Sequence, residues 1–252
     1  MRLYFVTPVW GRNHIGLFLE VGLPSLLAPG NLPGISKICE CRFIIYTLPE
    51  DEQRLRDARV VRRLGSQMPV EFCLIGDPVS SAHRTMSDCH ADTMRRADED
   101  DAAAVFIPPD CIWADDGMMR LARIAQSGKS AVLMSGLRLD RDAVVPLLRD
   151  RRTENGEVLQ ITARPLVELG LRHLHKIALG HFWNEHGGGL MPANLYWTVP
   201  GEGLALRCYH LHPLLVKSQI PFARFASTID DDLVREKAHR LEGNTGAADL
   251  HS

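Results

Sequence analysis

Short apolar runs recur along the first half of the chain, and each of them ends in a loop. Their length and their β-branched and aromatic residues predict strands at residues 3–6, 43–47, 70–75, 102–107 and 131–134, of which the last two should be buried. The run Ala-Ala-Ala-Val-Phe-Ile at 102–107 contains no polar residue. This is the pattern of a strand that is covered on both faces.

The segments between these runs have helical character. Ile15, Phe18 and Leu23 fall at helical spacing and predict a helix over residues 14–27, which Pro24 should kink or end. Three more helices are predicted at residues 50–63, 80–97 and 115–128. The first of these is highly charged and should be exposed. Serines can cap the second, and Asp115 or Asp116 is more suited to capping the third than to binding a ligand.

Regular alternation of strands and helices predicts an α/β fold. We expect a Rossmann-like, doubly wound and mostly parallel sheet flanked by helices. The second half of the chain is less periodic, with a helix at 165–183, a glycine loop at 187–189 and a strand at 203–210. It reads as an irregular C-terminal extension.

We therefore predict one domain over residues 1–235. Residues 1–140 form the half that binds the main ligand, and residues 141–235 form the half that shapes the binding site for the substrate. The polar, small-residue stretch 236–252 predicts a flexible tail.

Composition narrows the class of protein. The chain has 252 residues and a net charge of -2, which favours neither nucleic acid nor an anionic membrane over the molecule as a whole. No apolar stretch is long enough for a transmembrane segment, and the N-terminus lacks the features of a signal peptide. The six cysteines are scattered without a C-x-x-C pair. We expect a cytoplasmic protein with reduced cysteines and no nucleic-acid partner.

Candidate chemistry gathers where the predicted strands end. Thr7 and Pro8, Asp77, and Asp110 all follow strands, and open α/β sheets bind ligands at the carboxyl ends of their strands. Asp110 stands behind the rigid pair Pro108-Pro109, so its carboxylate could hold magnesium or manganese. The alternative is that Asp110 only caps a turn.

Two H-x-H pairs differ in their context. On a strand, His210 and His212 face the same side, so both could contact a metal, a phosphate or a substrate, or both could be structural. His173 and His175 fall on a predicted helix, where residues two apart point in different directions. That pair cannot jointly hold one metal ion.

Two further segments could carry out proton transfer. One carboxylate of Asp230-Asp231-Asp232 could act as a general base, or the run could form a solvated turn. The segment 181–186 combines aromatic, imidazole and carboxylate groups, a mixture suited to sugar stacking, although its aromatic rings could equally belong to the core. Dinucleotide-binding, Walker-type, serine-hydrolase and zinc-protease motifs do not occur in the sequence.

Four segments together resemble GT-A-type glycosyltransferases, and the chain is similar to bacterial glycosyltransferase-like proteins. These segments are Phe5-Val-Thr-Pro-Val-Trp10, Met86-Ser-Asp-Cys-His90, Val105-Phe-Ile-Pro-Pro-Asp-Cys111 and Ser227-Thr-Ile-Asp-Asp-Asp232. The resemblance implies a nucleotide-sugar donor, a divalent cation (Mn or Mg) and an acceptor that is a glycan, a lipid or a protein. It assigns nucleotide binding to Thr7, Pro8, Arg12, Arg84 and Asp88.

The resemblance also assigns the metal to Asp110, although the usual D-x-D motif is replaced here by Pro108-Pro109-Asp110. A late histidine, His210 or His212, could complete the metal site. Asp231 or Glu185 is then the candidate base that deprotonates the acceptor hydroxyl. Two other functions remain open: a non-catalytic protein that binds a nucleotide sugar or glycan, and a metal-dependent hydrolase that uses His210 and His212.

Overall fold

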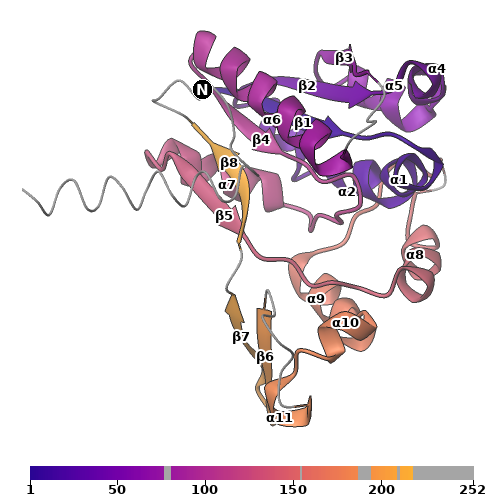
Figure 1. Ribbon diagram of the computed structural model, residues 1–252, viewed down its shortest axis with the longest axis vertical. Helices are drawn as coiled ribbons and strands as arrows, with labels where there is room; N and C mark the ends of the chain where they lie inside the picture. Colours follow the sequence, from indigo (N-terminus) through magenta and orange to yellow (C-terminus); the bar gives the residue numbers. More distant parts are fainter. Residues whose placement is uncertain (77–80, 154, 187–193, 209–210, 218–252) are drawn as a thin grey trace, which may run out of the picture.

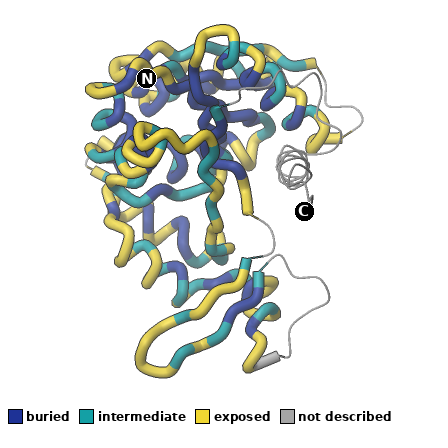
Figure 2. The backbone as a smooth tube through the Cα atoms, turned by 90° about the vertical axis from the view of Figure 1, so that its left-hand side faces the viewer, coloured by how far each residue is buried: buried dark blue, intermediate teal, exposed yellow. Residues whose placement is uncertain are grey.

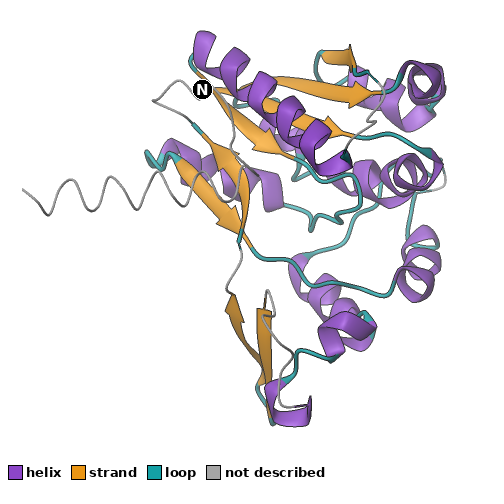
Figure 3. Ribbon diagram, viewed as in Figure 1, coloured by secondary structure: helices purple, strands orange, loops and turns teal. Residues whose placement is uncertain are grey.

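The computed structural model describes residues 1–76, 81–153, 155–186, 194–208 and 211–217. Within these ranges, a six-stranded sheet has the order β3-β2-β1-β4-β8-β5 and is flanked by helices (Figures 1 and 3). Its parallel strands are β1 (Arg2–Pro8), β2 (Glu40–Thr47), β3 (Val70–Leu74), β4 (Ala102–Phe106) and β5 (Ala131–Met134). The strand β8 (His212–Val216) is antiparallel to both of its neighbours, β4 and β5. The predicted α/β fold with a mostly parallel sheet is confirmed, and it fits a Rossmann-like arrangement.

Alternation along β1 explains why both faces of the sheet are covered. Leu3 and Phe5 point to one face, and Tyr4 and Val6 point to the other, because successive side chains of a strand alternate. All four side chains are buried. An uninterrupted apolar strand therefore needs helices on both of its sides, as the sequence pattern predicts.

The two faces are covered unequally. One face is covered by α6 (Ala82–Glu99), whose Cys89, Met94 and Ala97 pack against it. The other face carries the larger core and a layer of helical segments. These are α1 (Arg12–Leu17), the π-helical η1 (Phe18–Gly22), α2 (Leu23–Leu26), α3 (Leu32–Ile35), α4 (Pro49–Asp57), α5 (Arg59–Gly65) and α7 (Gly117–Gln126).

The predicted helix over 14–27 is present, and a π turn resolves its conflict with Pro24. Proline has no backbone N–H and clashes with the carbonyl four residues earlier in an α-helix. In η1 the Leu23 N–H donates to the Phe18 carbonyl, five residues back, and Pro24 then falls in the first turn of α2. The helical path therefore continues through the proline instead of ending at it.

Two predictions in the first half were wrong in detail. The charged segment 50–63 forms α4 and α5, which are separated at Ala58 by an extended backbone (φ -67°, ψ 126°). This break turns Val60 and Leu64 of α5 into the core. Strand β5 was predicted to be buried, but it lies at the edge of the sheet and is partly exposed.

The second half builds a smaller unit below the sheet (Figure 1). Its elements are α8 (Arg141–Arg149), α9 (Ala163–Arg172), α10 (Lys176–Leu179), α11 (Trp183–His186), β6 (Asn194–Val199) and β7 (Gly203–Cys208). The single helix predicted at 165–183 is thus wrong, since breaks fall after α9 and α10. Strands β6 and β7 pair as an antiparallel hairpin that projects from the molecule and is largely exposed along β7 (Figure 2).

Several predicted features lie outside the described residues. They are Asp77, Ser80, the glycine loop 187–189, the run 230–232 and the tail 236–252. Within the described ranges, no helix combines the length and the apolar character needed to cross a bilayer.

Candidate functional site

The order of the strands reverses between β1 and β4. From β1 the chain builds outward through β2 and β3, and then crosses back to place β4 on the other side of β1. In doubly wound sheets ligands bind beyond the carboxyl ends of the strands at this point of reversal. The candidate site is therefore the edge formed by Pro8, by the segment 107–110, and by the N-terminus of α6.

At the end of β1, Thr7 and Pro8 are both buried. The Thr7 hydroxyl donates a hydrogen bond to the carbonyl of Ile107, so it ties the carboxyl ends of β1 and β4 together. Beyond it, Gly11 has a positive φ of 74°, and its N–H donates to Asp51 Oδ2 at 2.7 Å. Arg12 follows and is exposed. Of the residues predicted for this strand end, Arg12 therefore has the side chain that a ligand can reach.

Asp110 is exposed at the tip of the loop that follows β4. Beneath it, Gly22 lies so close to the loop that a Cβ atom on Gly22 would stand 2.7 Å from the Pro109 carbonyl oxygen. The Ser25 hydroxyl donates to the Gly22 carbonyl at 2.7 Å and accepts from the Trp113 N–H at 3.0 Å. The loop is thus fixed from below, and Asp110 stands on a rigid support.

Asn31 fixes the far end of the same loop and is completely buried. Its Nδ2 donates to the carbonyls of Ser25 (2.9 Å) and Ala114 (3.0 Å). Its Oδ1 accepts from the Met118 N–H at 2.9 Å, in the first turn of α7. A residue far away in the sequence therefore caps α7, and the prediction that Asp115 or Asp116 caps it was wrong.

Asp115 and Asp116 do not cap α7, and each has a different environment. The Asp115 carboxylate accepts from the Gly30 N–H and from Gln160 Nε2, both at 2.7 Å, so it joins three segments of the chain. Asp116 precedes α7 in a left-handed conformation (φ 70°) and makes no capping hydrogen bond. Neither carboxylate belongs to the exposed edge around Asp110.

The N-terminus of α6 reaches the same edge, because α6 runs back from the end of β3 to the start of β4. Ser81 caps this helix through its Oγ, which accepts from the Arg84 N–H at 3.4 Å. Arg84 Nε and Asp88 Oδ1 form an ion pair of 3.2 Å, with both side chains more than half exposed. A stronger anion could replace Asp88 at Arg84, because an exposed pair of this kind is weak.

His212 is the first residue of β8, which is antiparallel to β4 and so begins on the side of the sheet where β4 ends. β8 pairs with β4 at Ala104 and Val105, and its register against β5 shifts between Val132 and Leu133. His212 is exposed and pairs with Met134 of β5. The antiparallel strand thus begins where β4 ends.

The side chains at this edge can be compared with the ligands that a divalent cation prefers. Within the described residues, no group of three or more histidine, cysteine, aspartate or glutamate side chains could enclose a metal ion. Magnesium and manganese, however, bind through one or two carboxylates together with substrate phosphates and waters. Exposed Asp110 fits that requirement. The neighbouring Cys111 does not, because burial, reinforced by the Asp110 carboxylate, raises the pKa of its thiol to about 12.

The remaining predicted site residues are not brought to this edge by the described structure. His210 and Asp231 lie outside the described residues. Glu185 belongs to α11, which lies at the lower end of the molecule, well away from β1 and β4 (Figure 1). His175 Nδ1 accepts from the Ile177 N–H at 3.2 Å before α10, so it acts as a helix cap.

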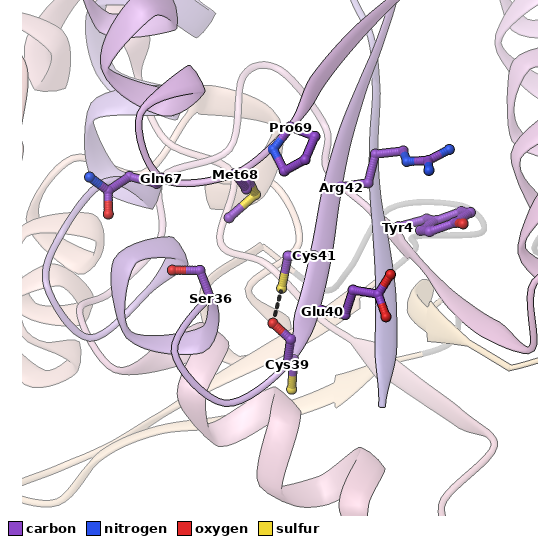
Figure 4. A pocket seen from close by; sticks show the side chains of 9 residues that line it. All are labelled: Tyr4, Ser36, Cys39, Glu40, Cys41, Arg42, Gln67, Met68 and Pro69. Atoms are coloured by element: carbon purple, nitrogen blue, oxygen red, sulfur yellow. Dashed lines mark hydrogen bonds between the residues drawn. The ribbon is translucent and has the colours of Figure 1, made fainter.

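A pocket of about 260 Å³ occupies the opposite edge of the sheet, where β2 begins (Figure 4). Cys39, Cys41 and Arg42 line it, and Cys41 Sγ donates to the Cys39 carbonyl at 3.5 Å. Burial raises the pKa of both thiols, that of Cys41 to about 12, so they remain protonated. None of the predicted site residues lies there, and we do not regard it as the functional site.

Sequence reasoning missed the support beneath Asp110. Gly22, Ser25 and Asn31 fall in or next to a segment that reads as the end of a helix and a turn-rich link. Their spacing to the loop of Asp110 is set by the fold, so a local pattern cannot reveal it.

Comparisons with known proteins leave this site without an assigned family. No protein-family model matches the sequence, and no curated protein matches it. The fold and the edge together define the class, an α/β protein with a mostly parallel sheet and an exposed, mixed-charge edge beyond β1 and β4.

Proposed function

We propose that the protein is a glycosyltransferase of the GT-A type, which binds a nucleotide-sugar donor across the carboxyl ends of β1 and β4. One observation carries the proposal. The order of the strands reverses between β1 and β4, and Arg12, Arg84 and Asp110 are all exposed beyond that reversal. Two cations and one carboxylate at a single sheet edge suit a diphosphate with an associated divalent cation.

Each exposed side chain has a role in this proposal. Arg12 and Arg84 bind the diphosphate, and Arg84 exchanges its surface partner Asp88 for the stronger phosphate anion. Asp110 holds manganese or magnesium, and His212 stands at the same edge. When bound, the cation neutralises negative charge on the leaving diphosphate. The rigid loop beneath Asp110 keeps its carboxylate in place, which lowers the cost of organising the site.

The general base for the acceptor hydroxyl is not assigned to a described residue. Helix α11, which carries Glu185, lies away from the edge. Asp231 therefore remains the candidate of the two, on sequence grounds alone.

The test is calorimetric titration with nucleoside diphosphates, with and without manganese. We expect Asp110→Asn to remove the manganese-dependent part of binding, and to leave the melting temperature unchanged because Asp110 is exposed. The matched control is Asp142→Asn, a carboxylate on α8 that is 96% exposed and lies outside the edge. If Asp110→Asn binds a nucleoside diphosphate with manganese as the wild type does, the proposed site is wrong.

A non-catalytic nucleotide-sugar or glycan-binding protein is the second candidate. Its support is the loop before Asp110, where Pro108 and Pro109 occupy positions that could otherwise carry a second carboxylate. Donor hydrolysis and sugar transfer, measured over a panel of nucleotide sugars, separate the two functions. Binding with no turnover of any donor supports the binding protein, whereas turnover that Asp110→Asn abolishes supports the transferase.

A further inference from the structure

The connection between β1 and α1 is very short, and both of its ends are fixed. The Val9 N–H donates to the Tyr46 carbonyl at 2.8 Å, which extends the hydrogen bonding of β1 with β2 to Val9. The Ile15 N–H donates to the Gly11 carbonyl at 3.1 Å, so the helical path already begins at Gly11. Only one residue separates Val9 from Gly11, and Arg12 follows directly after this turn.

Gly11 makes the turn in a backbone conformation that other residues disfavour. Its φ is 74° and its ψ is 149°, a region that is essentially restricted to glycine. A Cβ atom on Gly11 would nevertheless meet nothing within 4 Å. The backbone angles therefore require glycine here, whereas the space around it does not. A substitution at Gly11 acts by changing the path of the chain.

One side chain from another element holds this turn. The Gly11 N–H donates to Asp51 Oδ2 at 2.7 Å, and Asp51 stands in the first turn of α4. Helix α4 is itself anchored, because its Leu55 is completely buried and the guanidinium of Arg56 lies 4.1 Å from the centre of the Phe72 ring. Asp51 is therefore a fixed point of the main core to which Gly11 is attached.

The position of Arg12 depends on this attachment. Arg12 is exposed and is the first residue of α1, directly after Gly11. A change in the angles of Gly11 would displace the backbone of Arg12 and, with it, the base of the arginine side chain. Directed contacts tolerate little displacement, since an error of about 1 Å in a binding group can cost much of its effect.

We propose that Asp51 is a positioning residue for the diphosphate: it holds the Gly11 turn, and the turn places Arg12 where its guanidinium binds the ligand. This inference rests on the proposed function, because it takes Arg12 to bind the diphosphate. Asp51 itself does not contact the ligand, since a carboxylate repels a diphosphate. Its contribution is the hydrogen bond that it accepts from Gly11.

The first test is calorimetric titration with uridine, guanosine, adenosine and cytidine diphosphate, each with manganese. Asp51→Ala removes the acceptor for the Gly11 N–H, and we expect binding to weaken about tenfold as the hydrogen bond from Arg12 is impaired. Asp51→Asn keeps an oxygen that can accept the same hydrogen bond, so it should bind at least as well as the wild type. Loss of a negative charge near a diphosphate favours binding, so charge cannot explain a loss in Asp51→Ala.

The matched control is Glu50→Ala. Glu50 is an exposed carboxylate in the same turn of α4, and Asp51, its neighbour, is the residue that accepts from Gly11. Glu50→Ala should therefore leave binding unchanged. Thermal unfolding of each variant checks that the fold is retained.

The second test asks whether Asp51 acts through Gly11 and Arg12. Gly11→Ala should weaken binding to a similar extent as Asp51→Ala, and the two substitutions together should weaken it little further, because both release the same turn. In an Arg12→Gln background, Asp51→Ala should have no additional effect on binding. A residue that only stabilises the fold would weaken binding in both backgrounds.

The third test needs no ligand. Hydrogen exchange of the Gly11 amide, followed by NMR, reports the hydrogen bond to Asp51 directly. Exchange should be slow in the wild type and in Asp51→Asn, and fast in Asp51→Ala.

Three results would overturn the positioning role and leave the proposed function standing. The first is a loss of binding in Asp51→Asn equal to that in Asp51→Ala, because Asp51 would then act through its charge. The second is a loss in Asp51→Ala that persists in the Arg12→Gln background. The third is equal exchange of the Gly11 amide in the wild type and in Asp51→Ala. Binding of none of the four diphosphates by the wild type would instead reject the proposed function, and this role with it.

Discussion

Gly22 offers the sharpest test of how the fold supports Asp110. Replacing it with alanine has two opposed effects. Gly22 has an ordinary helical backbone (φ -62°), so alanine alone would stabilise the helix by about 1 kcal/mol. The added Cβ would, however, stand 2.7 Å from the Pro109 carbonyl oxygen and 3.4 Å from that of Cys111. Both contacts are with backbone atoms, which cannot rotate away.

Overpacking of this kind costs about 1 to 3 kcal/mol, so the clash outweighs the helical gain. We expect a net loss of up to about 2 kcal/mol for Gly22→Ala, which lowers the melting temperature by up to about 8 °C in a chain of this size. The loop of Asp110 must also move, so manganese-dependent binding of a nucleoside diphosphate should weaken. Gly16→Ala is the matched control.

A Cβ on Gly16, in α1, would meet nothing within 4 Å. Gly16→Ala should therefore stabilise the protein by about 0.5 to 1 kcal/mol. The assay is thermal unfolding followed by circular dichroism, with both variants measured beside the wild type. If the two substitutions change the melting temperature equally, the close approach of Gly22 to the loop is refuted.

Three other predictions concern Asn31, Asp92 and Cys111. Asn31→Ala removes the three hydrogen bonds of a buried side chain and should cost about 1.5 to 4.5 kcal/mol in thermal unfolding, so a loss below about 1 kcal/mol would contradict its role. Burial works to raise the pKa of Asp92, but the hydrogen bond from Tyr46 and the neighbouring arginines lower it overall. The lowered pKa of Asp92 adds to the free energy of unfolding above the unfolded pKa of about 4, and this gain is lost as the pH falls through the lower folded pKa. The difference in the free energy of unfolding between wild type and Asp92→Asn, measured in urea, should therefore disappear in acid. Cys111 and Cys208 are both partly buried, but desolvation and the Asp110 carboxylate raise the pKa of the Cys111 thiol to about 12, so iodoacetamide at neutral pH should label Cys208 first, and equal rates would contradict this.

The pattern of apolar residues was sufficient to predict the parallel strands of the sheet. Strands at 102–107 and 43–47 are buried on both faces, and such strands leave apolar runs that a single sequence reveals. The prediction of a ligand-binding edge after β4 also rests on local features, since Pro108 and Pro109 end the strand and Asp110 follows them. In the structure Asp110 is exposed after β4, and ligand binding at this edge stays a prediction.

What could not be predicted depends on contacts between distant residues. β8 is short, contains Pro213 and pairs antiparallel, so the alternation of strand and helix does not indicate it. The cap on α7 comes from Asn31, and no local pattern connects Asn31 with Met118. The break at Ala58 occurs because α5 must turn Val60 toward the core, a demand of the tertiary packing.

The position of β8 has a consequence for how the chain acquires its fold. Strands β4 and β5 are both paired with β8, which stands between them. As the chain leaves the ribosome, one edge of β4 therefore stays open until residues 212–216 emerge, after the whole hairpin unit. Pairings between such distant residues form slowly, and open strand edges attract other chains in the meantime. Nascent chains that stop before β8 should accordingly be the species most dependent on chaperones.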